Sequence, residues 1–311
     1  MDTKFDENIF YGHLIKGNLN SALGYLKRFP EQAGLYDRYR RVFEQGHFVT
    51  YDTDSRLNEL LAVYQQYYRD VFYLNVNAEE AVGRMRNRFS ALLDADQNMA
   101  FDAMENCLIA EAFQSRSFHF LGGKTGGYYG PYIWSITETR QYDVELPGGV
   151  QAYTVRFLDG FLAKSWLDYL SFGAVSTGGW SDGDGIINCV KSSYDVESES
   201  FQVSLLKHEA QHAMDLSKYR NMSSEDLEYR AKLVELIYSG KRNLLTRFMY
   251  EAGTENAGNG HAQAAERLVE GFSEALRRGR GELCFLSIGQ IQSVAKALFA
   301  QSNDEIRSKY T

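Results

Sequence analysis

The segment LLKHEAQHAMD, residues 205–215, is the part of the sequence from which the rest is interpreted. It places His208 and His212 four residues apart, with Glu209 directly after the first histidine. In a helix, such histidines lie on one face with their Cβ atoms about 5–6 Å apart, so both imidazoles can bind one ion. Glu209 lies one position round the helix, where it can accept a proton from a metal-bound water. The spacing predicts a zinc site in which Glu209 is the catalytic base.

The residues around this motif favour a helix. Apolar side chains recur on one side of the segment, and no proline or glycine occurs between positions 201 and 222. Such a run of helix-compatible residues can hold both histidines at the required spacing.

A catalytic zinc usually has three protein ligands and one open position, so we expect a third ligand downstream. The candidate is Glu228, in a helix expected over residues 223–237 with Ser223 and Asp226 spaced as a capping box. In a helical projection Glu228 lies between two apolar faces, which is unusual for a carboxylate that only faces solvent.

Further carboxylates compete for this role or support it. Glu235 shares the helical row of Glu228, and is expected either to hold a ligand by a hydrogen bond or to be the ligand itself. Glu266 and Glu270 are the remaining alternatives. Asp215 lies on the same helical face as both histidines and can accept an imidazole N–H, although a solvated aspartate explains it equally well.

Composition limits the class of protein. The 311 residues include 33 basic and 41 acidic side chains, a net charge of -8, which argues against nucleic acid as a partner. The three cysteines are far apart and form no CxxC pair, so we expect neither a disulfide framework nor a thiolate zinc site. No window approaches 18 apolar residues, and the charged first eight residues do not resemble a signal peptide.

The chain predicts an α+β fold in the order helices, small sheet, helices. Residues 15–115 have a helical period, and residues 1–118 are interpreted as a helical N-terminal region, followed by a catalytic domain over 119–311. Within the second part, a hairpin turn is expected at 147–149 and a short helix at 161–170. The expected strands are residues 132–137, 142–146, 150–158, 174–177 and 185–190.

Two glycine-containing motifs are not interpreted as ligand sites. Residues 122–125, GGKT, resemble the end of a phosphate-binding loop, but position 118 is phenylalanine where that loop needs glycine. Residues 182–185, DGDG, resemble the start of a calcium loop, but Ser193 stands where a bidentate acid is required.

The motif resembles that of the HExxH zinc metallopeptidases, or zincins, over roughly residues 130–275. Within them it is closest to the gluzincins, whose third ligand is a glutamate on a later helix. The metzincin pattern does not fit, because Asp215 and Lys218 stand where its glycine and third histidine belong. The spacing from His212 to Glu228 is shorter than in thermolysin-like members, and the pattern around Glu270 keeps that residue as a rival.

The resemblance implies a small mixed sheet before the HExxH helix, whose edge strand pairs with an extended peptide substrate. Residues 178–190 would border the cleft, with Trp180 near it. These enzymes commonly stabilise the oxyanion with a histidine or tyrosine, for which His261 is the first candidate and Tyr229 and Tyr238 are alternatives.

The function expected from these observations is that of a zinc-dependent hydrolase, specifically a peptidase that acts on a peptide or protein. A second hypothesis is a structural zinc site in a non-catalytic binding or regulatory module. A third is that the histidines bind no metal.

Overall fold

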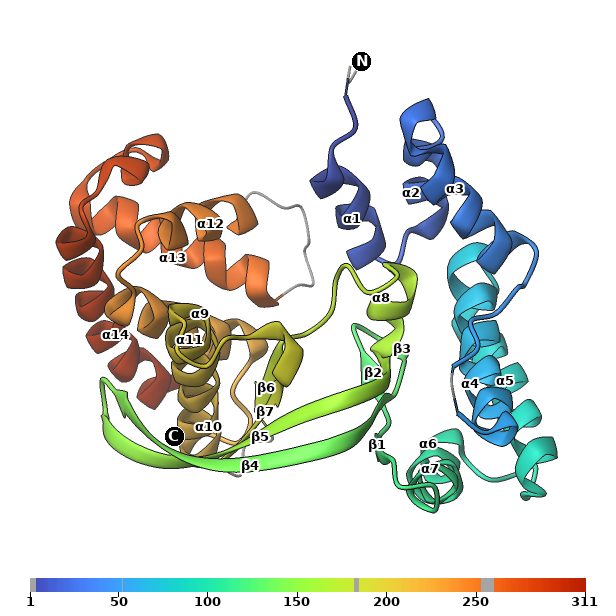
Figure 1. Ribbon diagram of the computed structural model, residues 1–311. Helices are drawn as coiled ribbons and strands as arrows, with labels where there is room; N and C mark the ends of the chain where they lie inside the picture. Colours follow the sequence, from blue (N-terminus) through green and yellow to red (C-terminus); the bar gives the residue numbers. More distant parts are fainter. Residues whose placement is uncertain (1–3, 52, 182–184, 253–259) are drawn as a thin grey trace. The chain divides into compact units, whose positions relative to one another are not determined.

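The computed structural model describes residues 4–51, 53–181, 185–252 and 260–311 as a mixed α/β structure (Figure 1). The chain forms two compact units, residues 1–136 with 159–177, and residues 137–158 with 178–311. This division differs from the boundary expected at residue 118, because the small strands after that residue belong to the helical unit. None of the described helices combines the length and apolar character that a membrane crossing requires.

The first unit is mainly helical, as its sequence period predicts. Its helices are α1 (Glu7–Ile15), α2 (Leu19–Leu26), α3 (Ala33–Tyr39), α4 (Ser55–Tyr68), α5 (Ala78–Leu93), α6 (Phe101–Met104), α7 (Ala110–Gln114) and α8 (Ser165–Leu170). Its short strands are β1 (His119–Leu121), β2 (Lys124–Thr125) and β3 (Tyr128–Tyr129). Aromatic rings fill the core, and buried tyrosine hydroxyls find acceptors, as where Tyr64 donates to Glu105 Oε1 at 2.7 Å.

The GGKT segment binds a carboxylate of this chain. The Gly123 N–H donates to Glu105 Oε2 at 2.7 Å, and a Cβ atom on Gly122 would lie 2.6 Å from the same carboxyl group. A larger side chain at Gly122 would therefore displace Glu105. The similar-looking DGDG segment falls largely on residues 182–184, outside the described part of the chain.

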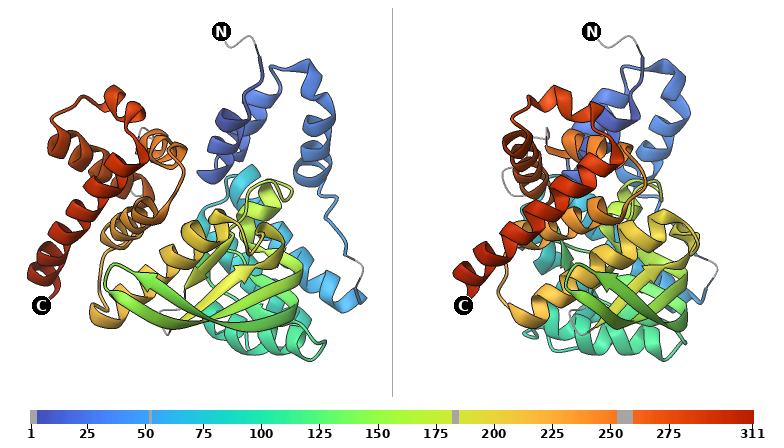
Figure 2. Two further views of the ribbon diagram at one scale, coloured as in Figure 1. Left: turned by 60° about the vertical axis from the view of Figure 1, so that its left-hand side comes forward. Right: turned by 90° about the vertical axis from the view of Figure 1, so that its left-hand side faces the viewer.

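A long hairpin replaces the three separate strands expected between residues 132 and 158. β4 (Tyr132–Leu146) and β5 (Gly149–Lys164) are neighbours in the sheet and are joined by the expected turn at Pro147 (Figure 2). The helix expected over 161–170 is wrong in its first part, because β5 continues to Lys164 and α8 begins only at Ser165. A short apolar run such as residues 161–163 does not distinguish a strand from a helix.

The sheet has the order β1-β4-β5-β7-β6, and it is mixed. β7 (Ile186–Val190) pairs in parallel with residues 154–158 of β5, and β6 (Gly179–Ser181) pairs antiparallel with β7 as an edge strand. The strand expected at 174–177 is not formed, because the Val175 N–H donates to Ser171 Oγ at 2.9 Å in a turn after α8.

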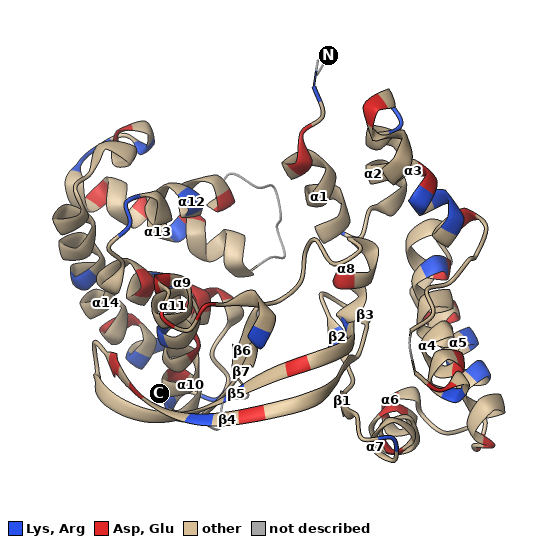
Figure 3. Ribbon diagram, in the orientation of Figure 1, with Lys and Arg blue, Asp and Glu red and all other residues tan. Residues whose placement is uncertain are grey.

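The second unit completes its core with the C-terminal helices. They are α9 (Glu199–Phe201), α10 (His208–Lys218), α11 (Ser224–Tyr238), α12 (Asn243–Ala252), α13 (Gly260–Leu276) and α14 (Ile288–Tyr310). α11 packs against α10, α13 and α14, and side chains at eleven of its positions are buried. Figure 3 shows acidic residues gathered around α9 and α11, so charge is present where this helix is enclosed.

The start of α11 is held by one buried carboxylate. Half of the expected capping box is present: Ser223 Oγ accepts from the Asp226 N–H, but the Ser223 N–H donates to Tyr310 Oη and not to Asp226. Asp226 is only 2% exposed. Burial alone would raise the pKa of Asp226, but its hydrogen bonds outweigh burial and hold this pKa well below its usual range. Its side-chain donors are Lys309 Nζ at 2.6 Å, Tyr310 Oη at 2.7 Å, Ser223 Oγ at 2.8 Å and Arg267 Nη1 at 2.7 Å.

Asp226→Asn is expected to lower the free energy of unfolding at pH 7 by roughly 1–3 kcal/mol, because it removes the charge that these donors share. The stabilisation should be complete above the ordinary carboxyl pKa of about 4 and be lost as the pH falls below it, since the folded-state pKa is lowered. Urea unfolding at pH 7, 5 and 3, with chelator present, measures this. Asp304→Asn, an exposed change on α14, is the control; a difference that does not shrink at low pH contradicts the prediction.

Candidate metal centre

The HExxH motif forms the first turns of α10, as the sequence predicts. A π-helical turn at Gln202–Lys207 precedes it, and such turns are often found at functional sites. Ala210 and Ala213 bury the opposite face of the helix, and the Tyr153 hydroxyl donates to the Ala210 carbonyl at 2.9 Å. This bond fixes α10 to strand β5 and leaves the histidine face directed at α11.

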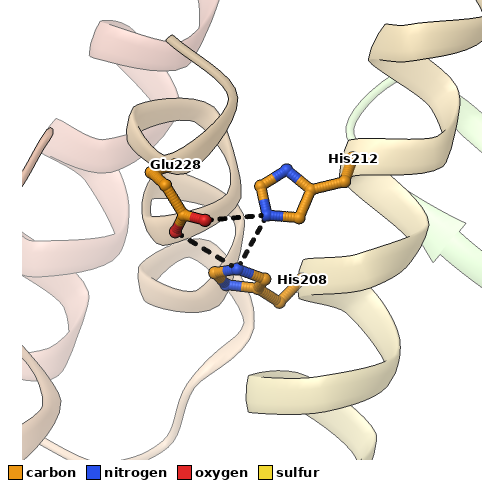
Figure 4. Close-up of side chains that lie close together, drawn as sticks. All are labelled: His208, His212 and Glu228. Atoms are coloured by element: carbon orange, nitrogen blue, oxygen red, sulfur yellow. Dashed lines mark hydrogen bonds and ion pairs between the residues drawn. The ribbon is translucent and has the colours of Figure 1, made fainter. Parts of the chain in front are cut away.

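Three side chains from α10 and α11 converge (Figure 4). His208 Nε2 and His212 Nε2 are 2.9 Å apart, and the Glu228 carboxylate lies 3.3 Å from His212 Nε2 and 3.5 Å from His208 Nε2. Among the described residues, these three form the only group of three or more histidine, cysteine or acidic side chains whose ligand atoms are close enough to hold one ion. The structure thus brings Glu228 to the two histidines.

The geometry of this group fits a zinc ion. A tetrahedral Zn²⁺ with ligand bonds of about 2.0–2.1 Å separates its ligand atoms by about 3.3 Å. The three observed separations, 2.9, 3.3 and 3.5 Å, lie around that value. Two imidazoles and one carboxylate are also the donor set of several catalytic zinc sites.

The buried carboxylates near His208 favour a positive charge on this group. Burial lowers the pKa of His208, but the carboxylates of Glu228 and Glu235 outweigh burial and raise this pKa to about 10. Burial would raise the pKa of Glu228, yet its contacts with His208, His212 and His261 hold this pKa far below its usual range. Without a metal, therefore, a proton on His208 balances the buried carboxylates.

Glu235 contacts the site from a position two turns after Glu228 on α11. The His208 Nδ1–H donates to Glu235 Oε1 at 2.8 Å, which orients the ring and leaves Nε2 toward Glu228. Glu235 is 2% exposed, and its other oxygen lies 3.4 Å from Arg247 Nη2 on α12. Of the two roles expected for Glu235, the contacts match the one that supports a ligand through a hydrogen bond.

Asp215 does not have the expected contact with an imidazole. Its carboxylate accepts instead from Arg230 Nε at 2.8 Å, and both side chains are buried. His212 Nδ1 is buried without a hydrogen-bond acceptor among the described residues. Helical projection places Asp215 on the histidine face, but it does not show that α11 brings a guanidinium to that carboxylate.

The other expected ligands lie elsewhere. Glu266 pairs with Arg280 at 2.9 Å on an exposed surface. Glu270 is an exposed residue of α13 and does not belong to the group that can hold an ion.

Of the two expected catalytic residues, His261 contacts the candidate metal group, and Glu209 adjoins it along the chain. Glu209 follows His208 on α10 and is partly buried. His261, at the start of α13, is 54% exposed, and its Nδ1 lies 2.9 Å from Glu228 Oε2. A third helix therefore contributes a side chain to the edge of the group.

The two expected tyrosines have other contacts. Tyr229 is buried under the Arg267 guanidinium, 4.0 Å from its ring centroid, and Tyr238 lies 3.9 Å from Lys207 Nζ. A further tyrosine, Tyr194, was not among the residues expected from the sequence. Burial raises the pKa of Tyr194 to about 12, and Cys189, Glu209 and Glu235 raise it by smaller amounts. Nothing in the sequence distinguishes it among 21 tyrosines.

The edge strand β6 packs on α10 next to the site. Leu205, just before the motif, lies 2.6 Å from the position that a Cβ atom of Gly179 would occupy, so glycine is required for this close approach. Trp180 lies on β6 and is partly buried. The edge of the sheet is therefore beside the helix that carries the two histidines.

Comparison with family models, with curated proteins and with solved structures found no match. A functional assignment therefore depends on the residues of this chain.

Glu235→Ala is expected to weaken zinc binding about 10–100-fold, because His208 loses the acceptor that orients its ring. Competition with a chromophoric chelator measures the affinity. Glu225→Ala, at a partly exposed position one turn before Glu228, is the matched control and should bind zinc as the unmodified protein does. Equal affinities for both variants would show that Glu235 does not support the site.

Proposed function

We propose that this protein is a zinc-dependent hydrolase that cleaves peptide bonds. The observation that carries the proposal is the convergence of His208, His212 and Glu228 at tetrahedral ligand spacing, with Glu209 next to the first ligand. His208 and His212 would bind through Nε2 and Glu228 through its carboxylate. This arrangement supports the gluzincin resemblance, whose third ligand is likewise a glutamate on a later helix.

Each residue has a definite task in the proposed reaction. A bound Zn²⁺ supplies a Lewis acid that lowers the pKa of a coordinated water to about 7 and polarises a carbonyl group. Glu209 accepts the proton of the attacking water and returns it to the leaving amine. Glu235 keeps the His208 ring in the orientation that directs Nε2 to the metal.

His261 is the proposed group for the developing oxyanion. It is exposed, lies at the start of a helix and contacts Glu228, so it can reach a substrate beside the ligands. An imidazole N–H there would stabilise the negative charge that forms when the carbonyl carbon is attacked.

The proposed substrate is an extended peptide. β6 is the last strand in the sheet order and lies beside α10, and an extended peptide can add to such a strand. Trp180, on this strand, would then contact substrate side chains.

Glu209→Gln is expected to keep stoichiometric zinc and to lose hydrolysis by about 10²–10⁴-fold, because glutamine cannot accept the proton. Zinc content is measured by elemental analysis and hydrolysis by mass spectrometry of a mixed peptide library. Glu197→Gln, an exposed neighbour on the loop before α9, is the control with expected full activity.

Undiminished hydrolysis by Glu209→Gln would rule out the proposed base. Zinc bound by four protein ligands, together with no hydrolysis by the unmodified protein, would favour the structural zinc site instead. A protein purified without chelator that holds no zinc would contradict both.

A further inference from the structure

A cavity of about 400 Å³ lies within the second unit, apart from the metal group. It is bounded by the β4–β5 turn at Pro147 and by α10, α11 and α14. Its volume is within the range of about 300–1,000 Å³ that is typical of small-molecule sites. None of the three proposed zinc ligands lines it.

Three cationic side chains line this cavity, namely Lys218, Arg230 and Lys296. Arg230 is 5% exposed and donates through Nε to Asp215 and through Nη1 to Ser302 and Asn303. Its Nη2 group has no acceptor within the described ranges. In the same part of the chain, neither lysine has a carboxylate within ion-pair distance, so only Arg230 is balanced by an acid.

The rest of the wall is mainly apolar. Met214, Ile237 and Phe299 line the cavity, and the Arg230 guanidinium lies over the Phe299 ring, 4.3 Å from its centroid. A cavity with apolar walls and a cationic group suits a ligand that has an apolar body and one anionic end. An inorganic anion would leave the apolar wall uncovered, and a neutral apolar molecule would leave the cations unpaired.

We propose that this cavity binds a small organic anion with an apolar body, such as an aliphatic or aryl-aliphatic carboxylate. The carboxylate accepts hydrogen bonds from Arg230 Nη2 and is attracted by Lys218 and Lys296. The apolar body packs between Met214 on α10 and Phe299 on α14. Because the cavity shares no residue with the three ligands, the proposal holds whether or not the zinc site hydrolyses peptides.

Calorimetric titration of the full chain tests the chemistry of the ligand. Decanoate and 3-phenylpropionate are the probes, decanol has the apolar body without the charge, and inorganic phosphate has charge without the body. At least one carboxylate is expected to bind with one-to-one stoichiometry, at least tenfold more tightly than decanol or phosphate. Absence of saturable binding by both carboxylates, or equal binding of decanol or phosphate, overturns the proposal.

Variants then locate the site. The double change Lys218→Met with Lys296→Met removes two cations, and Ala300→Trp fills the cavity from its exposed rim; each is expected to weaken carboxylate binding at least tenfold. Arg278→Met, an exposed charge change after α13 at a position that does not line the cavity, should leave binding unchanged. Circular dichroism checks folding. Unchanged binding by folded forms of both the double variant and Ala300→Trp overturns the location.

Discussion

The burial of five charged side chains on α11 constrains the whole second unit. Asp226, Glu228, Arg230, Lys232 and Glu235 are each no more than 8% exposed. An unpaired buried charge costs several kcal/mol, so each needs an opposite partner from a neighbouring element. The partners come from α14 and α13 for Asp226, from α10 for Glu228 and Arg230, and from α12 for Lys232 and Glu235. The same ion pairs therefore hold the helices together and position the residues of the candidate site.

This constraint explains how the three side chains of the candidate metal group are held in place. Glu228 cannot turn to solvent, and Glu235 holds the His208 ring at the correct angle for its Nε2 to meet Glu228. A proposed ligand set that is already oriented loses little conformational freedom when it binds. The histidine proton would be exchanged for a metal ion of the same sign.

Local patterns predicted much of this unit and tertiary contacts determined the rest. The HExxH helix and the Ser223 cap depend on short-range spacing, and the structure has both. A carboxylate between two apolar faces indicates burial, which is why the sequence predicts Glu228 as a ligand, and Glu228 is buried beside the histidines. The predicted contact between Asp215 and an imidazole is wrong, because the partner of Asp215 is Arg230 on another helix. The long hairpin was missed because pairing between β4 and β5 extends both strands beyond their own alternating segments.

The three residues of the candidate metal group are also close together in the sequence. His208 and Glu228 are only twenty positions apart, on two helices joined by the short segment between Lys218 and Ser224. Closing so short a loop has a small entropic cost, and contacts of low sequence separation form early in folding. A helical hairpin of residues 208–238 therefore needs no long-range contact to bring its two imidazoles and its carboxylate together. The free energy of binding the proposed ion would then add directly to the free energy of folding of the second unit.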